Sequence, residues 1–527
     1  MKKILCFLLT LSFAATAQPP VYKAVVHNPP AGYYFVSAYK TVALSYPVIF
    51  DEAGHIVYYE KLAATNSIDF KLHAIGQMSY NPSNLNKFLI FDSTFKVIDT
   101  VAAVGGPTDI HELQMLPNGH YLLLSSENDT MNLSSYYYFT NNHAMPGSTA
   151  AIVKSSVIQE LDSAKNLVFE FHHHDNFPFD EVDPFFLSSQ TSVDWSHSNA
   201  LELDRDSNIL MSSRHFDEIT KIDRDSGKIL WHFGGKYNQF TFLTDTTRFY
   251  GQHDIRRLPN GHITLYDDGN HFASSRHAAR AVEYELDEVN MTAKLVWSYT
   301  YNPLIYSTSQ GSVQMLPNKN TLIDYGTINK DSVCFNMVDS LGTELYNVKF
   351  KGGLLSYRTH YYPSLPWQLP RPTFSCFDSL GTFYLKTDST YASYIWSDGS
   401  TGSTLAITDT GTYYVFVPYG PRGYVSSQPL TLTNLNSQCM STTQINGIHE
   451  RDSRLFPNPA QNKLTVFFTR TEKNTIPMIK DVYGKNIELH GTMNSDNSYT
   501  FDVSELAAGV YFVSAGYTTL KFIKSGN

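Results

Sequence analysis

Charged side chains are scarce in this sequence. They make up 17% of its 527 residues, against roughly 25% in an average globular protein, whereas aromatic residues reach 14%. A chain so rich in aromatic residues and so poor in charge is neither disordered nor a long coiled coil. The formal net charge is −10 and no run of basic residues occurs, so we expect no nucleic-acid partner.

Long apolar runs are also missing. Beyond the N-terminus no stretch approaches the roughly 20 apolar residues that a transmembrane helix needs. The first residues, MKKILCFLLTLSFAATAQ, combine two lysines, an apolar stretch from Ile4 to Ala14 and a small-residue cleavage site ending at Ala17. This pattern is typical of a secretory signal peptide. We therefore predict a signal peptide over residues 1–17 and an exported mature chain.

Cysteine is rare, with four residues in the whole chain. Cys6 lies in the predicted signal peptide, which leaves Cys334, Cys376 and Cys439 in the mature protein. An exported protein can form disulfides. Because Cys376 and Cys439 bracket one small segment, we expect these two to pair and Cys334 to be a buried thiol.

What the sequence does have is an internal repeat. Similar segments begin at His111 (HELQMLPNGHYLLLSS), His197 (HSNALELDRDSNILMSSRH), His253 (HDIRRLPNGHITLYDDG) and Gln310 (QGSVQMLPNKNTLIDYG), with a degenerate copy at His73. In each, a turn signal such as Asn-Gly separates two alternating apolar runs, which predicts a β-hairpin.

A further aromatic-rich strand follows each hairpin. These closing strands begin near Ile56, Lys96, Leu167, Ile229, Leu295 and Glu344. Six units of four strands at an irregular period predict an all-β fold, a six-bladed β-propeller over residues 18–365. A tandem of β-sandwiches is the alternative, but it does not require the same hairpin in every unit.

The propeller interpretation places the start of each hairpin on an innermost strand, facing the channel. We then expect His73, His111, His197 and His253 at equivalent positions. The side chains of His111, His197 and His253 should lie within one cavity. Gln310 would follow in the fifth unit and His360 in the sixth. The alternative is that these histidines are a relic of the repeat, each bonded to a backbone carbonyl. Burying several titratable groups together is costly unless they have a role.

The pattern changes after Pro366. Residues 370–440, with short alternating strands and Trp396 in a core position, resemble an immunoglobulin-like β-sandwich module. Residues 450–527 contain LFPNPAQNKLTVFF, MIKDVYGKNI, LAAGVYFVSAG and TLKFIK. This set resembles the C-terminal sorting domain of the type IX secretion system, a small β-sandwich. The resemblance implies that the type IX machinery is a partner and that the chain is secreted or reaches the cell surface.

Five stretches of the predicted propeller form an ordered set. They are DWSHSNALEL around His197, ILMSSRHFDEITKI around Arg214, YGQHDI around His253, LYDDGNH up to His271, and SRHAARAVEYELDE leading into LVWSY. In type and order, over residues 50–350, they resemble the arylsulfate sulfotransferase family. The resemblance implies transfer of a sulfuryl group from an aryl sulfate donor to a phenolic acceptor, without a nucleotide sulfate or another cofactor.

The resemblance also implies roles for particular residues. His253 corresponds to the nucleophile that carries the sulfuryl group in a ping-pong mechanism. His197, Arg214 and His111 correspond to further catalytic positions, and Asn199 to a substrate-binding one. The assignment of His111 depends on its place in the repeat, and no role follows for Gln310.

These residue types suit the chemistry. Neutral imidazole is a competent nucleophile, and histidine is mostly neutral at pH 7. The guanidinium of Arg214 can meet two oxygens of a sulfuryl group as charge develops there. A second histidine, His197 or His111, can exchange a proton with the phenol. The sequence leaves open which of the two does so.

Two other motifs are candidate cation sites. His172-His173-His174-Asp175 looks like a metal cluster, but adjacent residues on a strand point to opposite faces and cannot all ligate one ion. Asp267-Asp268-Gly269-Asn270 lacks the spaced carboxylates of a calcium loop. We therefore predict no metal site. The run Tyr136-Tyr137-Tyr138 is expected in an insertion, where it walls the funnel or packs within a strand.

The leading hypothesis is an exported arylsulfate sulfotransferase. The alternative is a surface propeller that binds an aromatic or glycan ligand and catalyses nothing. A binding funnel would not require His253, His197 and Arg214 in one ordered set. Whether the chain forms a homodimer is left open.

Overall fold

The computed structural model describes residues 18–40, 43–140, 143–187, 189–270, 278–328, 332–441, 453–467, 477–482, 485–494, 498–515 and 518–526. The predicted signal peptide over residues 1–17 lies outside these ranges, as does His271. The chain divides into two compact units, Met1–Cys439 and Met440–Asn527.

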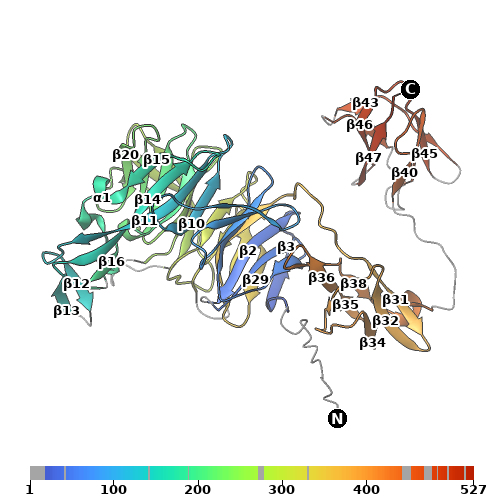
Figure 1. Cartoon of the computed structure of the whole chain (residues 1–527), viewed down its shortest axis with the longest axis horizontal. Coiled ribbons are helices and arrows are strands. Elements are labelled where there is room, and N and C mark those ends of the chain that lie inside the picture. Colours follow the sequence, from blue (N-terminus) through green and yellow to red (C-terminus); the bar gives the residue numbers. More distant parts are fainter. Residues whose placement is uncertain are drawn as a thin grey trace, which may run out of the picture. The chain divides into compact units, whose positions relative to one another are not determined.

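Antiparallel sheets make up nearly all of the first unit (Figure 1). In six of them, four strands are neighbours in turn, from an innermost to an outer strand. The innermost strands are β30 (Leu355–Tyr362), β6 (Ser67–Leu72), β10 (Thr108–Met115), β17 (Ser198–Leu203), β22 (His253–Arg257) and β26 (Ser312–Met315). The fourth strands are β4 (Ile56–Glu60), β9 (Val97–Val101), β15 (Leu167–His172), β20 (Ile229–Gly234), β25 (Thr292–Tyr299) and β29 (Glu344–Phe350).

The middle strands of these sheets complete the pattern. They are β2 (Tyr33–Lys40) and β3 (Leu44–Asp51), β7 (Met78–Pro82) and β8 (Phe88–Phe91), β11 (Tyr121–Met131) and β14 (Ala151–Leu161), β18 (Ile209–Ser213) and β19 (Glu218–Ile222), β23 (Ile263–Asp267) and β24 (Arg280–Asp287), and β27 (Thr321–Asp324) and β28 (Phe335–Val338). The predicted closing strands therefore coincide with the observed fourth strands to within a few residues.

The innermost strands form a closed ring. Each contacts the innermost strand of the next sheet, and the ring closes where β30 contacts both β26 and β6. β30 comes from the end of the segment and pairs with β2 from its beginning, while β1 (Tyr22–Val26) pairs with β29. The first and last sheets thus each contain strands from both ends of the segment. The predicted all-β propeller fold is confirmed.

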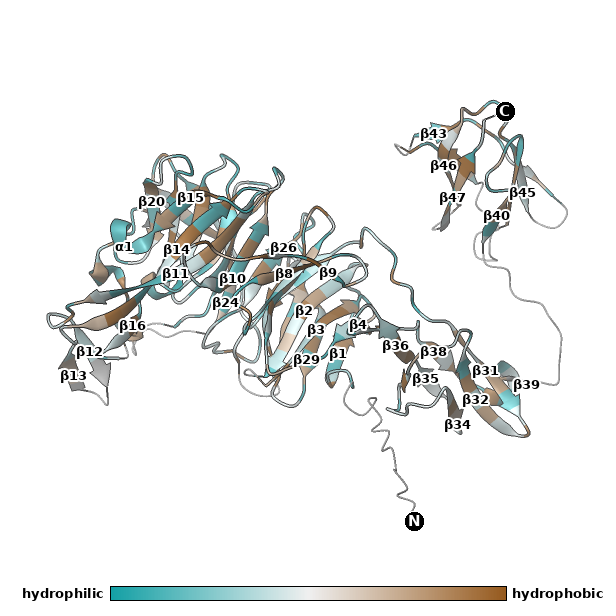
Figure 2. Ribbon diagram, viewed as in Figure 1, coloured by the Kyte–Doolittle hydropathy of each residue, from teal (hydrophilic) through white to brown (hydrophobic). Residues whose placement is uncertain are grey.

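Apolar side chains fill the space between sheets, and Figure 2 shows apolar residues recurring along the strands. One such cluster joins the sheet that begins with β17 to the sheet that begins with β22. It includes Ala200, Leu210, Ile219, Ile255, Leu265 and Val282, all fully buried. Because the strands alternate in and out, each sheet buries both faces against its neighbours.

Several innermost strands are irregular near their N-terminal ends. The pairing register shifts in β6, β10, β17 and β22. Backbone φ is positive at Asp69 (58°), His197 (45°), Asp254 (60°) and Gln310 (72°). Such bulges redirect side chains and are common next to active sites. They turn polar residues toward the channel that a regular strand would place elsewhere.

The third sheet contains an inserted hairpin, and a segment of short helices connects it to the fourth sheet. The hairpin β12 (Tyr137–Thr140) and β13 (His143–Pro146) projects between β11 and β14. After β15 come α1 (His173–Asn176), η2 (Phe179–Glu181) and η3 (Pro184–Phe186), and η3 contacts β12.

The immunoglobulin-like segment shares a sheet with the propeller. β37 (Gly423–Ser426) pairs with β4 and with β36 (Val415–Tyr419), so the first sheet continues into this segment. A Cβ on Gly423 would lie 2.4 Å or less from ring atoms and the hydroxyl of Tyr58, so the close approach of the strands needs glycine here.

A second sheet of this segment contains β31 (Phe374–Ser379) and β32 (Thr382–Thr387). Trp396 is 1% exposed in the core of the segment. Cys376 and Cys439 form a disulfide, and Cys334 is a buried free thiol. The predicted cysteine pairing is therefore confirmed, while the boundaries 18–365, 370–440 and 450–527 stay a prediction.

The second unit consists of two four-stranded sheets. They are β40 (Arg454–Phe456), β41 (Lys463–Phe467), β45 (Tyr499–Asp502) and β44 (Thr492–Met493), and β43 (Asn486–Ile487), β42 (Met478–Lys480), β46 (Gly509–Ala515) and β47 (Thr518–Lys524). Leu464, Ile479, Phe501 and Phe522 are fully buried in one cluster. This unit therefore has a core of its own.

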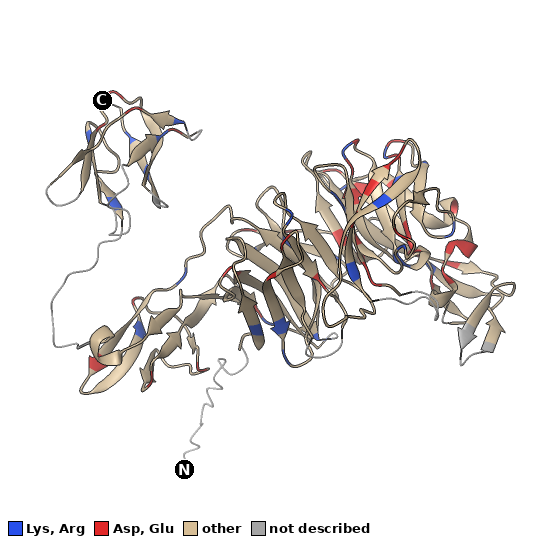
Figure 3. Ribbon diagram, turned by 180° about the vertical axis from the view of Figure 1, so that it is seen from behind, with Lys and Arg blue, Asp and Glu red and all other residues tan. Residues whose placement is uncertain are grey.

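Figure 3 shows acidic and basic residues interspersed over the propeller sheets and sparse in the segment from β31 to β38. None of the helices among the described residues is long and apolar enough to cross a membrane.

Candidate active site

Three neighbouring sheets contribute the residues that the motifs single out. His253 is the first residue of β22, His197 directly precedes β17, and His111 lies in β10. Arg214 begins the short helix η4 (Arg214–Phe216), which follows β18 in the same sheet as β17. Because β10, β17 and β22 are successive strands of the ring, their N-terminal ends lie close together.

Each of the three histidines contacts a carboxylate through the same ring nitrogen, Nδ1. The partner of His253 is Asp268, at 2.8 Å, and the partner of His197 is Asp194, at 2.5 Å. His111 contacts Asp109. A carboxylate on Nδ1 holds the proton on that nitrogen of the neutral ring, so Nε2 carries the lone pair.

Burial lowers the pKa of His253 well below its usual range, and the charge of nearby Arg214 lowers it further. His197 and His111 act in the same direction. The backbone N–H of Gln310 donates to Nε2 of His253 at 3.1 Å, which agrees with a lone pair on that nitrogen. His253 is 1% exposed and is therefore a neutral imidazole at physiological pH.

The other histidine rings contact one another. His111 meets His197 edge to face, with the ring centroids 5.0 Å apart, and His197 stacks on His215 at 4.6 Å. Phe186 covers the other face of His215 at 4.0 Å. Burial lowers the pKa of His197, although Asp194 opposes this shift. Burial also lowers the pKa of His215, so the stacked rings of His197 and His215 lie next to a buried cation without sharing its charge.

That cation is Arg214. Its Nη1 donates to Nε2 of His215 at 2.8 Å, and its Nη2 donates to the carbonyl of Thr308 at 2.8 Å. Its guanidinium carbon lies 4.7 Å from the centre of the Phe186 ring. Nε is buried without a hydrogen-bond partner in the described part of the chain. An orphaned donor on a fixed guanidinium suits an anionic substrate group.

Asn199 is fully buried and spans two sheets. Its side-chain N–H donates to the carbonyl of Gln252 at 2.8 Å, directly before His253 in the chain. The backbone carbonyl of Asn199 accepts a hydrogen bond from Nη2 of Arg358 at 2.5 Å. The amide donor that would meet a substrate is therefore engaged in holding the backbone next to His253.

The expectation of equivalent positions is wrong for His73 and His197. In every hairpin the same turn bond recurs, for example from Leu258 N to His262 O and from His73 N to Gln77 O. His253 precedes its turn residue Leu258 by five positions, whereas His73 is itself the turn residue. His73 Nε2 contacts Ser79 at 2.7 Å, and burial lowers the pKa of His73 to about 3.

By the same count, the position in β17 that matches His253 is Asn199, two residues after His197. His197 reaches the site because its backbone adopts a positive φ of 45°. His360, in β30, contacts Asp69 at 3.0 Å.

Sequence reasoning missed Asp109, Asp194, His215 and Asp268. Asp194, His215 and Asp268 lie within the stretches DWSHSNALEL, ILMSSRHFDEITKI and LYDDGNH, so the available signal was their place in these motifs. Asp268 was interpreted as part of a turn. The atoms of Asp194, His197 and His215 that could bind an ion lie within 4.8 Å of one another, so these three could also hold a metal.

A cavity of about 560 Å³ is lined by residues that adjoin the site in sequence, but His111, His197 and His253, which we expected within one cavity, are not among its lining residues. Phe216 and Asp217 follow Arg214 and His215, and Tyr250 precedes His253 by three residues. Tyr136 and Tyr137 of the insertion also line it. The cavity has the size and aromatic walls of a small-molecule site.

Comparison with known families agrees with this arrangement of residues. The family model described as Arylsulfotransferase (ASST) matches residues 21–361, more than half of the chain. The chain belongs to the arylsulfotransferase family. The model of the secretion system C-terminal sorting domain matches residues 454–525, so the chain is marked for export to the cell surface or the medium.

Solved structures resemble this chain distantly. A protein of unknown function from Bacteroides caccae is 12% identical, with a TM-score of 0.39 over 62% of this chain and 98% of that one. Virginiamycin B lyase from Staphylococcus aureus with quinupristin is 11% identical, with a TM-score of 0.33 over 70% and 96%. Neither likeness supports an argument about activity. No curated protein matches the sequence.

Proposed function

We propose that this arylsulfotransferase moves a sulfuryl group from an aryl sulfate ester to a phenolic acceptor in two steps, with His253 as the group that carries it. The observation that supports this most is the environment of His253. The ring is buried and neutral, its Nδ1 is held by Asp268, and its Nε2 lone pair faces a backbone donor.

In the first step, the Nε2 lone pair forms a bond to sulfur, and the bond between sulfur and the aryl oxygen breaks. The phenolate leaves with the electron pair of that bond. The ring gains positive charge, which the Asp268 carboxylate stabilises across 2.8 Å. The N–H of Gln310, which Nε2 gives up, is then placed to meet a sulfuryl oxygen.

Arg214 supports both steps. The three sulfuryl oxygens carry negative charge during the transfer, and a buried guanidinium with an unused Nε–H can donate a hydrogen bond to one of them without reorganising. Its contacts with His215 and Thr308 fix its plane.

In the second step, the acceptor oxygen bonds to sulfur and the bond from sulfur to Nε2 of His253 breaks. The phenolic proton must go to a base within hydrogen-bond reach. His197 is neutral, with its lone pair on Nε2, so it suits the role of base. His111, which has the same carboxylate arrangement, is the other candidate.

The test uses the mature protein and a chromogenic aryl sulfate. With donor alone, we expect a burst of one phenolate per protein and a sulfuryl mass shift on the peptide that contains His253. Adding phenol should remove the shift. His253→Ala should abolish the burst, the adduct and turnover.

The matched control is His262→Ala, in the turn that follows β22, where His262 contacts Glu283 away from the site. It should keep the burst. An adduct on His197 would show that the histidines have exchanged roles. Full turnover in His253→Ala would exclude the mechanism, and binding of donor without any turnover would favour a binding propeller.

A further inference from the structure

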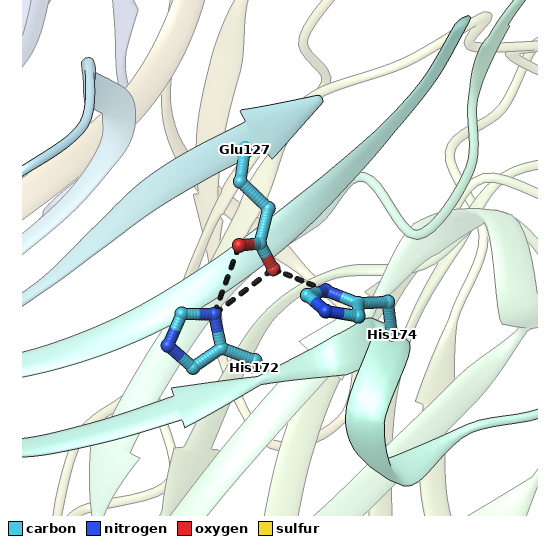
Figure 4. Close-up of side chains that lie close together, drawn as sticks. All are labelled: Glu127, His172 and His174. Atoms are coloured by element: carbon cyan, nitrogen blue, oxygen red, sulfur yellow. Dashed lines mark hydrogen bonds and ion pairs between the residues drawn. The ribbon is translucent and has the colours of Figure 1, made fainter. Parts of the chain in front are cut away.

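A second cluster of ligating side chains lies on the third sheet, outside the histidine site. Glu127 belongs to β11, His172 ends β15, and His174 lies in α1. Figure 4 shows the rings of both histidines turned toward the carboxylate of Glu127. His173 between them points elsewhere, because it is fully buried and its Nδ1 contacts the carbonyl of Ser156 at 2.6 Å. Because His173 points away from Glu127, the side chains of His172 and His174 lie on the same side of the backbone.

The ligand atoms are already close. Nδ1 of His174 lies 2.5 Å from Oε1 of Glu127, and Nδ1 of His172 lies 2.9 Å from Oε2. All three candidate ligand atoms lie within 4.8 Å of one another. Ligands at about 2.0–2.1 Å around a tetrahedral ion must approach one another this closely.

The far nitrogens of the two rings also have partners. Nε2 of His172 contacts Glu170 at 3.1 Å, and Nε2 of His174 contacts Asp175 at 3.3 Å. Metal-binding histidines usually donate their second N–H to a carboxylate, which fixes the tautomer and makes the ligating nitrogen more basic. Two such arrangements converge on Glu127.

The cluster is open on one side. The side chains of Glu127, His172 and His174 are 25%, 31% and 35% exposed. Glu127 and His172 also line a groove of about 520 Å³. An ion can therefore enter, and the exposed carboxylate can move aside to admit it while water completes the coordination.

We propose that Glu127, His172 and His174 form a site for a divalent transition-metal ion of the zinc class, with two imidazole ligands and one carboxylate. The bound ion would cross-link the end of β15 and the helix α1 to β11. The segment after α1 leads through η2 to η3 and Phe186, which stacks on His215. The site therefore would stabilise the wall of the histidine site from outside it.

The experiment uses the untagged mature protein, stripped with a chelator and titrated with Co²⁺ and Zn²⁺. We expect one tight equivalent of Co²⁺ with the intense visible absorption of four-coordinate geometry, displaced by Zn²⁺. Zn²⁺ should raise the melting temperature, since it binds the folded state. His172→Gln and His174→Gln should each abolish the Co²⁺ spectrum.

Glu170→Gln tests the outer contact and should weaken Zn²⁺ binding roughly tenfold without abolishing it. The matched control is His120→Gln, in the turn directly before β11, where His120 contacts one carboxylate, Glu160. It should bind Co²⁺ as the parent does. All variants are checked for native circular dichroism before titration.

Three results would overturn the proposal. One is the absence of tight Co²⁺ or Zn²⁺ binding to the folded protein, which would make the cluster an ion-pair network alone. Another is an unchanged spectrum in His172→Gln and His174→Gln. The third is loss of the equivalent in His197→Gln instead, which would assign the ion to Asp194, His197 and His215.

Discussion

Asp268 determines which nitrogen of His253 is available for attack. Because its carboxylate holds Nδ1–H at 2.8 Å, it positions the ring and also balances the charge that sulfation creates. It touches no substrate atom in the proposed mechanism and is therefore a positioning residue.

We predict that Asp268→Asn lowers the rate of the phenolate burst by roughly a hundredfold or more while the KM for the donor changes little. An amide can present its N–H to Nδ1 and shift the lone pair to the wrong nitrogen. Burst kinetics with a chromogenic donor measure both quantities. A raised KM at an unchanged burst rate would show instead that Asp268 shapes donor binding.

Glu181 lines the cavity of about 560 Å³ and is the basis of a second prediction at this scale. Burial and the neighbouring Glu218 raise the pKa of Glu181 to about 9. The folded chain therefore retains a proton that the unfolded chain releases near its ordinary pKa of about 4.3. Stability is lost as the pH rises between these two values.

Glu181→Gln, which cannot ionise, should therefore raise the melting temperature at pH 8 and have little effect near pH 4. Thermal unfolding across this pH range measures the difference. Glu285→Gln, on a side chain that is 52% exposed, should show no such trend. A constant gain at all pH values would mean that the charge of Glu181 is not the cause.

The sequence motifs were enough to name the histidines and Arg214, but not their carboxylate partners. Asp109, Asp194 and Asp268 sit in short polar segments where an aspartate is ordinary for a turn. Each reaches its histidine through local backbone geometry, such as the positive φ of His197. A residue pattern does not report that geometry.

At the scale of elements, the hairpins and closing strands could be predicted because alternation and turn residues are local. The bulges of the innermost strands could not, because they depend on how each strand pairs with its neighbour. The same limit explains why His73 was misplaced. Aligning the hairpins by their histidines hides the fact that His73 is itself the turn residue, whereas His253 lies five residues before its turn.

The last innermost strand, β30, is fixed by a buried charge. Arg358 is 1% exposed, and its guanidinium contacts Glu112 at 3.0 Å, Asp254 at 3.3 Å and Asp69 at 3.4 Å. These carboxylates belong to three other sheets. Their shared cation therefore joins the closing strand to the rest of the ring.

Arg358→Met should destabilise the first unit by up to about 3–5 kcal/mol, because it removes the cation that contacts all three buried carboxylates and leaves only Lys71 and Arg256 to neutralise them. Arg358→Lys retains the charge and should cost less. Urea unfolding followed by tryptophan fluorescence compares the two. Equal losses in both variants would indicate that packing, and not charge, closes the ring.

At the scale of the whole molecule, the sorting unit has its own core, and the residues of the histidine site all belong to the first unit. A chain that ends before Leu455 should fold, keep the disulfide between Cys376 and Cys439, and retain the kcat/KM of sulfuryl transfer. In the native host it should fail to reach the surface. Activity assays of the purified protein and fractionation of cells measure the two effects separately, and a loss of kcat/KM would contradict the expectation.

The pairing of β37 with β4 has a consequence for association. An outermost strand with unpaired backbone groups is a template on which a second chain can add a strand. Here the backbone of Tyr58, Tyr59 and Glu60 is already occupied by residues of β37. A further copy cannot extend the first sheet at this edge, so any homodimer must use another surface. The immunoglobulin-like segment thus acts as an intramolecular cap, and its removal would expose β4 to edge-to-edge association with a second chain.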